Sequence, residues 1–146
     1  MNPAENAPQN FTLHHLVKGN DLNHHGTLFA GRGAEWFVES GFIAAASLSS
    51  PEHVVCVNIH GMVFSRPVPK GSIIRFDSKL IYTGRTSMTV YVRAILPKDA
   101  AFVVDGFLTF IHVDGEGKSS PHGLTVTATD PEDIALQAKA QSLVRK

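Results

Sequence analysis

One long apolar segment without proline most constrains how this chain can fold. Residues 28–48 are mainly Phe, Val, Leu, Ile, Ala and Gly, and the sequence Ser49-Ser50-Pro51 follows directly. A segment of this length that is apolar on nearly every side is typical of a buried helix. We therefore predict one long helix, buried on most sides, that ends at the Ser-Ser-Pro sequence.

The chain after this helix shows the two-residue alternation of β-strands. Four long runs of β-branched and aromatic residues, separated by Gly, Pro and Asp, cover residues 54–63, 73–82, 87–96 and 102–113. In the third run, apolar residues at 88, 90, 92 and 94 alternate with Thr89, Tyr91 and Arg93, which predicts one covered face. A shorter run over residues 11–17 predicts a further strand before the helix.

The two ends of the chain differ in composition. Residues 1–10 are mostly Pro, Ala, Asn and Gln, so we expect a flexible tail there, without the basic and apolar parts of a signal peptide. Asp130 is followed by Pro131 and two acidic residues, which is typical of a helix start. We predict a C-terminal helix over residues 131–144 of the segment 130–146, after a single domain over residues 11–129.

These elements together predict an α+β fold in which an antiparallel sheet wraps around one long central helix. The total of 146 residues is about one domain. Because a sheet of this kind has open edges, we expect a second copy of the chain to pair with it.

Charge and cysteine content exclude several classes of function. Lys plus Arg and Asp plus Glu both number 13, so we expect neither nucleic acid nor a membrane surface as a partner. Cys56 is the single cysteine, which excludes an intrachain disulfide and fits a reducing compartment. The sequence has no apolar run of about 18 residues that could span a bilayer. We therefore expect a cytoplasmic protein.

Three segments carry a resemblance to a known family. They are Asn23–Gly31, which runs into the helix, Phe64–Gly71, and Tyr82–Val90 with its Gly-Arg-Thr-Ser sequence. In their order and spacing they resemble the acyl-CoA thioesterases of the hotdog-fold superfamily, over roughly residues 12–125. The resemblance implies a hydrolase that cleaves acyl-CoA to a carboxylic acid and coenzyme A without a cofactor or metal. It also implies a homodimer at least, or a tetramer or hexamer, with active sites between subunits.

Thioester hydrolysis requires an activated water or a carboxylate nucleophile. Glu39 is our first candidate, because it interrupts the apolar helix, where an unpaired acid is unfavourable. In the family pattern the acid stands fifteen residues after the motif Asn, a position that Val38 occupies here. Glu39 comes one residue later, which displaces its side chain by about 100° around the helix. Glu35, one turn earlier on the same face, is the second choice. For both acids, an ion pair with Arg32 or with an arginine elsewhere is the structural alternative.

The reacting carbonyl also needs hydrogen-bond donors. The first backbone N–H groups of the helix, at Gly31 and Gly33, could hold the developing oxyanion, with Gly26 and Gly31 allowing close approach. The resemblance implies that Asn23 of the opposing chain positions the reactants, whereas an Asx turn is the structural alternative. His25 is a second-choice hydrogen-bond donor or proton carrier.

The Gly-Arg-Thr-Ser sequence offers one cation and two hydroxyls at a strand start. By resemblance, Arg85, Thr86 and Ser87 contact the coenzyme A part of the substrate, and Arg66 with Lys70 could add charge to the same rim. The structural alternative is an exposed hairpin with solvated polar groups.

Two other functions stay open from the sequence. A hotdog dehydratase or hydratase would need a histidine and an acid across the acyl chain, for which His25 and Glu39 are available. An acyl-CoA-binding module without turnover is consistent with the displaced acid and Val38. Acyl-chain length, the assembly above the dimer and the pathway are not encoded in any readable pattern.

Overall fold

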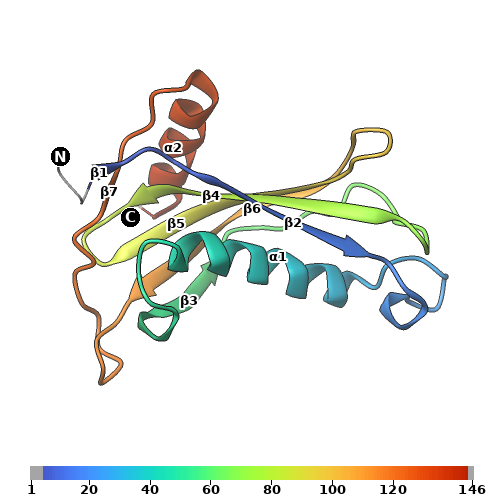
Figure 1. The fold of residues 1–146 in the computed structure, drawn as a ribbon, viewed down its shortest axis with the longest axis horizontal. Helices are drawn as coiled ribbons and strands as arrows, with labels where there is room; N and C mark the ends of the chain where they lie inside the picture. The colour runs from blue at the N-terminus through green and yellow to red at the C-terminus, as the bar shows by residue number, and fades with distance from the viewer. Residues whose placement is uncertain (1–4, 145–146) are drawn as a thin grey trace.

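The main feature of the molecule is a five-stranded antiparallel sheet with one helix on each face (Figure 1). The computed structural model describes residues 5–144. Across the sheet the strands are β2 (Asn10–Leu16), β4 (Ile73–Thr83), β5 (Ser87–Leu96), β6 (Ala101–His112) and β3 (Val54–Ile59). The long helix α1 (Ala30–Ala46) contacts all five strands from one side. The predicted α+β class is confirmed.

The second helix, α2 (Pro131–Val144), packs on the opposite face of the sheet, as Figure 1 shows. Its contact is a small apolar cluster in which Ala140 lies against Ile81 of β4 and Phe107 of β6. Within residues 5–144, neither helix combines the length and the apolar character needed to cross a bilayer.

Element bounds agree with the sequence predictions to within two residues, with one exception. β3 ends at Ile59 and does not continue to Val63. At Gly61 the backbone has a φ of +119°, a conformation that residues with a side chain rarely adopt. The chain then runs beside β6, where Ser65 donates its N–H to the carbonyl of Val103 at 2.7 Å. The run of β-branched residues around Gly61 did not indicate this backbone conformation. β3 therefore ends earlier than the sequence predicts.

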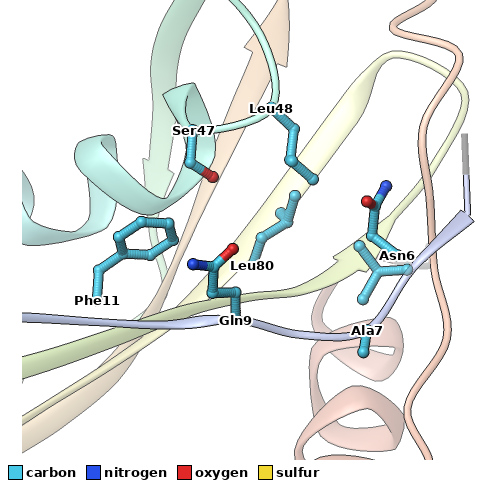
Figure 2. Close-up of a pocket in the computed structure, with 8 residues that line it drawn as sticks. Asn6, Ala7, Gln9, Phe11, Ser47, Leu48 and Leu80 are labelled. Atoms are coloured by element: carbon cyan, nitrogen blue, oxygen red, sulfur yellow. The ribbon is translucent and has the colours of Figure 1, made fainter. Parts of the chain in front are cut away.

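The N-terminal segment corrects our expectation of a flexible tail over residues 5–10. β1 (Glu5–Asn6) pairs in parallel with β7 (Thr125–Val126), and β2 begins at Asn10. Figure 2 shows this segment passing beside Ser47 and Leu48 at the end of α1, around a small hollow. The polar composition of this segment suggested a tail. The backbone of β1 is instead held by its pairing with β7, 120 residues further along the chain. Residues 1–4 and 145–146 lie outside the described residues.

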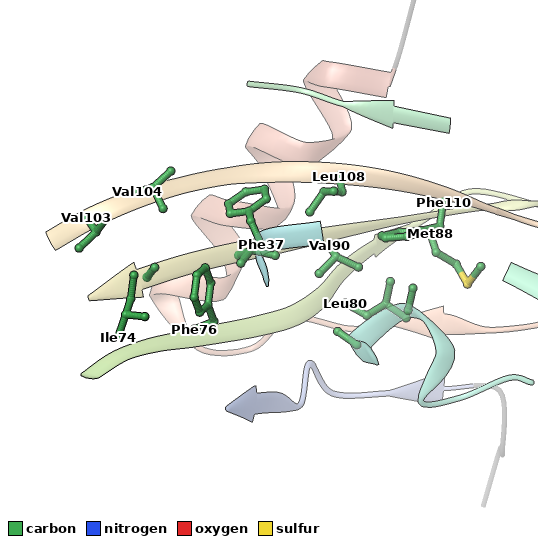
Figure 3. Packing of buried hydrophobic residues seen from close by; sticks show 14 of the residues in the cluster. Phe37, Ile74, Phe76, Leu80, Met88, Val90, Val103, Val104, Leu108 and Phe110 are labelled. Atoms are coloured by element: carbon green, nitrogen blue, oxygen red, sulfur yellow. The ribbon is translucent and has the colours of Figure 1, made fainter. Parts of the chain in front are cut away.

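One face of the sheet and one face of α1 form the core (Figure 3). Met88, Val90, Val92 and Ala94 of β5 are fully buried, which confirms the predicted covered face. Phe37 of α1 is also fully buried and belongs to the same cluster.

α1 lies close to the sheet because Gly41 has no side chain. A Cβ at this position would lie 2.8 Å from a methyl of Leu108 and 3.3 Å from one of Val92. Nearby, the Ser78 hydroxyl donates to the carbonyl oxygen of Ser40 at 2.9 Å. The buried residues of α1 all belong to this face: Gly33, Phe37, Ser40, Gly41, Ala44 and Ala45. The prediction of a helix buried on most sides is largely confirmed, because only Ala30, Glu35 and Glu39 of α1 are exposed, although the face opposite the sheet is only partly covered in the single chain.

The close approach of residues 60–65 to β6 yields a stability prediction. A Cβ at Gly106 would overlap the carbonyl oxygen of Gly61, which is backbone and cannot rotate away. We expect Gly106→Ala to lower the free energy of unfolding by about 1–3 kcal/mol, as overpacking does. Urea unfolding at equal protein concentration measures this change. Gly115→Ala is the matched control, because open space surrounds Gly115, and an equal loss in both variants would contradict the prediction.

Candidate active site

The loop before α1 is closed by Asn23. Its side-chain oxygen accepts from the backbone N–H of His25 at 2.9 Å and of Thr27 at 3.2 Å. Its Nδ2 donates to the Thr27 hydroxyl at 3.2 Å. This is the Asx-type turn that the sequence offered as the structural alternative for Asn23. One N–H of the amide is left with a single weak contact, to the Leu28 carbonyl at 3.5 Å.

At the start of α1, Gly31 and Gly33 have different surroundings, although the sequence predicted that both would hold the oxyanion. Phe29 caps the helix in an extended conformation, and Gly31 lies at the surface in a shallow hollow. Gly33, in contrast, donates its N–H to the Phe29 carbonyl at 3.1 Å and is buried against Phe64 and Leu28. The structure therefore assigns Gly33 to packing, because its helical position faces the sheet. Ala30 and Gly31 precede the first intrahelical N–H donor, as helix geometry requires.

The open face of α1 forms a shallow, mostly apolar hollow. It is lined by Gly31, Ala34, Glu35, Val38, Glu39 and Phe42. These residues form two rows at helical spacing, so both candidate acids and Val38 border the same surface. The one-residue displacement of the acid from the family pattern therefore leaves Glu39 at this hollow, beside the family position.

The two acids have different surroundings. Glu35 is exposed and forms an ion pair with Arg32 at 3.3 Å, while Arg32 also contacts buried Asp21 at 3.2 Å. This is the structural alternative foreseen for Glu35. Glu39 has no hydrogen bond or ion pair within residues 5–144. It is exposed in the single chain, so the expected burial is not provided by the chain's own residues.

His15 of β2 lies close enough to Glu39 for the two charges to interact. Its ring stacks on Trp36, with centroids 4.3 Å apart and planes at 6°. Its Nε2 is buried and has no hydrogen-bond partner in the described chain. Burial lowers the pKa of His15, and the nearby Glu39 carboxylate opposes this effect. No sequence signal connects these residues, because their proximity depends on how β2 packs on α1.

The Arg85–Ser87 turn is fixed by two histidines from the end of β6 and the segment beyond it. His112 donates its backbone N–H to the Thr86 carbonyl at 2.8 Å, and the ring Nε2 of His122 donates to the Ser87 carbonyl at 3.0 Å. The Leu124 N–H donates to the other ring nitrogen of His122 at 2.9 Å. Burial lowers the pKa of His122, which favours this neutral, doubly bonded form. The Arg85 side chain is exposed.

Arg66 and Lys70 do not share a rim with Arg85 in one chain. Both line a hollow beside Lys98, in the turn that follows β5, whereas Arg85 precedes β5. Ten strand residues separate these ends, a length of roughly 30 Å. Figure 1 shows the two turns at opposite ends of the sheet. The expected common rim is therefore corrected for the single chain.

His25 is likewise separate from Glu39. It is exposed in the loop before α1, where its ring lies against His24 with centroids 3.9 Å apart. It does not line the hollow on α1. The only metal-ligand grouping among the described side chains is Asp130, Glu132 and Asp133, and Lys79 already pairs with Asp133 at 2.8 Å.

One edge of the sheet is open and apolar. β3 pairs with β6 on one side, and no described strand pairs with its other side. Val55, Val57 and Ile59 of β3 are each about half exposed, and Val63 beyond it is three-quarters exposed. An apolar strand edge of this kind is suited to pairing with another chain.

The sheet, its single long helix and the acid-bearing hollow define a hotdog domain with the features of an enzyme site. The pattern of the Thioesterase superfamily matches residues 25–101, which is more than half of the chain. The chain belongs to this superfamily, and the resemblance inferred from its three segments is confirmed.

Individual relatives agree with this assignment. The chain is 28% identical to the acyl-CoA thioester hydrolase YciA of Escherichia coli over 137 residues, covering 86% of this chain and 99% of that protein. An acyl-CoA hydrolase of Staphylococcus aureus, solved with butyryl coenzyme A and coenzyme A, superposes with a TM-score of 0.80 at 25% identity, covering 92% and 81%. A hexameric hotdog-fold thioesterase of Campylobacter jejuni superposes with a TM-score of 0.66 at 28% identity, covering 86% and 94%.

The lowered pKa of His15 predicts a pH dependence of stability. The fold holds the pKa below its ordinary 6.5, so the unfolded chain binds this proton first as the pH falls. The stabilisation from neutral His15 is present above pH 6.5 and is lost below it. His15→Phe keeps the ring against Trp36 but cannot titrate. We expect this variant to lose less unfolding free energy than wild type between pH 7.5 and pH 5.5.

Urea unfolding at the two pH values measures this difference. His14→Phe is the matched control, because His14 is the exposed neighbour on the other face of β2. An unchanged pH dependence in His15→Phe would contradict the prediction.

Proposed function

We propose that this protein hydrolyses acyl-CoA thioesters to a carboxylic acid and coenzyme A, with Glu39 as the catalytic carboxylate. The observation that carries this proposal is the unpaired Glu39 at an apolar hollow on the central helix of a thioesterase-superfamily domain. The E. coli relative is an acyl-CoA thioester hydrolase and the S. aureus relative is an acyl-CoA hydrolase, which supports this substrate class.

The geometry of α1 supports a site built from two chains. Glu39 lies eight residues after Gly31, which is about 12 Å along a helix. A thioester carbonyl beside Glu39 is therefore out of reach of the Gly31 N–H of the same chain. If β3 pairs with β3 of a second copy around a twofold axis, the two α1 helices lie antiparallel on one face of the joined sheet. The N-terminus of one helix can then approach Glu39 of the other.

The same pairing would also bury the Glu39 side chain, which is exposed in the single chain. A second helix over the hollow would remove the carboxylate from bulk water and surround it with apolar groups, which favours a general base. The C. jejuni relative is a hexamer, which supports an assembly that contains at least a dimer. A dimer, or a tetramer or hexamer built from dimers, is consistent with the open β3 edge.

The proposed reaction needs water as its second substrate. Glu39 takes one proton from water while the oxygen bonds to the thioester carbon, and the carbonyl electrons move to its oxygen. The Gly31 N–H of the opposing chain holds this oxyanion. When the carbonyl re-forms, the carbon–sulfur bond breaks, and the coenzyme A thiolate takes up the proton held by Glu39, which restores the carboxylate. Direct attack by Glu39 on the carbonyl is the covalent variant of this mechanism.

Asn23 and the Arg85–Ser87 segment complete the proposed site. One N–H of the Asn23 amide makes only a weak hydrogen bond within its own loop. This N–H can donate to the carbonyl of a substrate bound at Glu39 of the neighbouring chain. Arg85 with the hydroxyls of Thr86 and Ser87 holds the phosphate or pantetheine part of coenzyme A. In this role His122 is a positioning residue, because it anchors the backbone of Ser87.

We further propose a cytoplasmic location. The single cysteine needs no oxidising compartment, and burial raises the pKa of the Cys56 thiol, which keeps it in the less reactive neutral form.

The roles of the two acids can be tested directly. We expect Glu39→Gln to lower kcat for acyl-CoA hydrolysis by roughly 100- to 10,000-fold, the usual loss when a general base is removed. Glu35→Gln should stay within about tenfold of wild type, because Glu35 forms only a surface ion pair. Release of free thiol from acyl-CoAs of several chain lengths measures both.

The outcomes separate the alternatives. Loss confined to Glu35→Gln would move the base one helical turn. Wild-type protein that binds acyl-CoA without releasing thiol would replace the hydrolase with a binding module. Hydration of an enoyl thioester without hydrolysis would indicate a hydratase.

The requirement for two chains generates a second test. We expect Val55→Lys to shift the protein to the mass of a single chain and to abolish most turnover, because a charge at this edge blocks strand pairing. Sedimentation velocity measures the mass. Ile134→Lys is the control, since Ile134 of α2 is about as exposed as Val55 but lies away from the β3 edge. An active Val55→Lys monomer would contradict the composite site.

A further inference from the structure

A buried ring nitrogen lies beside the candidate active site without a hydrogen-bond partner. This atom is Nε2 of His15, on β2, and no group within residues 5–144 bonds to it. The great majority of buried polar atoms in folded proteins have a partner, so each exception needs a physical explanation. The roles proposed above for the other site residues give His15 none.

Packing explains where the His15 ring lies, but not why the ring is an imidazole. The ring stacks on Trp36 of α1, with centroids 4.3 Å apart and planes at 6°. It meets Phe76 of β4 edge-on, with centroids 6.0 Å apart, and Trp36 also lies edge-on to Phe76. A phenyl ring could make the same contacts without burying an unpaired nitrogen. The nitrogen therefore points to a role other than packing.

The side chain of Glu39 lies next to this ring. Glu39 follows Trp36 by three residues, and side chains at this spacing are neighbours on one face of a helix. A ring that stacks on Trp36 is therefore beside Glu39, and the charge of Glu39 acts on His15.

The other charged groups that act on His15 are Asp21 and Lys18. Asp21 already forms an ion pair with Arg32 at 3.2 Å and accepts from the backbone N–H of Lys18 at 2.9 Å. The Lys18 side chain has no acceptor atom. Glu39 is thus the one charged acceptor of this group that the chain leaves unpaired within residues 5–144.

We propose that His15 is a positioning residue for Glu39: its Nε2–H donates a hydrogen bond to one carboxylate oxygen once a second chain covers the hollow on α1. The bonded oxygen is then fixed, and the other oxygen faces the water from which Glu39 takes its proton. Hydrogen bonds of this kind tighten in the substrate complex, so their absence from a single uncovered chain is expected. This inference rests on the proposed function, because it adds a residue to the same site.

The neutral form of the ring suits this role. Burial lowers the pKa of His15, so the uncharged ring predominates at pH 7. A neutral donor orients the carboxylate without pairing it with a full positive charge, which would weaken it as a base.

Hydrolysis of acyl-CoA by the full chain tests the role of the donor. His15→Phe keeps a ring against Trp36 but removes the N–H, and we expect kcat to fall about 10- to 100-fold with an unchanged KM, as loss of one hydrogen bond to a charged group does. His15→Gln places an amide N–H close to the position of Nε2 and should recover most of kcat. His14→Gln, on the exposed face of β2, is the matched control and should equal wild type.

The pH profile adds a readout that a purely structural role would not move. The acid limb of kcat against pH should move to higher pH in His15→Phe, because a hydrogen bond to the charged carboxylate favours that form. In His15→Gln the limb should stay close to that of wild type.

Proton NMR titration of the His15 ring gives a readout that does not depend on turnover. The Glu39 charge raises the pKa of His15 against the effect of burial. We therefore expect Glu39→Gln to lower the pKa of His15, and Glu35→Gln to leave it unchanged, since Glu35 is not among the groups that act on this ring.

Three results would overturn the inference. They are an unchanged pKa of His15 in Glu39→Gln, an equal loss of kcat in His15→Phe and His15→Gln, and a loss in His15→Phe that follows a lower free energy of unfolding. Absence of thiol release by the wild type would refute the proposed function instead, and the titration would still support or overturn the contact between the two side chains.

Discussion

The close contact between α1 and the sheet is the constraint on which the rest of the structure depends. Gly41 allows the helix backbone to approach Leu108 and Val92, and the Ser78 hydroxyl binds the Ser40 carbonyl. This contact orients the helix so that its other side, with Gly31 and Glu39, points away from the sheet. A larger residue at position 41 would displace or rotate α1, and the acid-bearing surface would move with it.

The open face of α1 and the open β3 edge are two apolar surfaces that the chain's own residues leave uncovered. A soluble chain rarely leaves an apolar strand edge and an apolar helix face exposed together. In the proposed site, the rise of about 12 Å along the helix from Gly31 to Glu39 is the reason why the donor and the acid are taken from different chains. The proposed pairing of two copies would cover the β3 edge and bring opposite ends of two helices together. Under this proposal, oligomerisation is a condition of catalysis.

The histidines show how position in the fold determines the role of a titratable group. His14 and His15 are adjacent, yet one is exposed and the other stacks on Trp36 with a buried Nε2. His122 holds the Ser87 carbonyl from a segment 35 residues away. Both His15 and His122 are favoured in the neutral form because burial disfavours their charge. As the pH falls below 6.5, the unfolded chain therefore takes up protons at these two positions before the folded chain does.

By itself, the sequence determined the two helices, the five strands of the main sheet, the class of fold and the family, but neither the β1–β7 pair nor the end of β3. Periodicity and turn residues are local, so the bounds of α1 and β5 and the covered face with Val90 follow from neighbouring residues alone. Only the tertiary structure decided that Gly33 packs inward, that Glu39 is exposed beside His15, and that Arg66 lies at the opposite end of the sheet from Arg85. These facts depend on which faces of distant elements meet, and close packing between elements sets that choice.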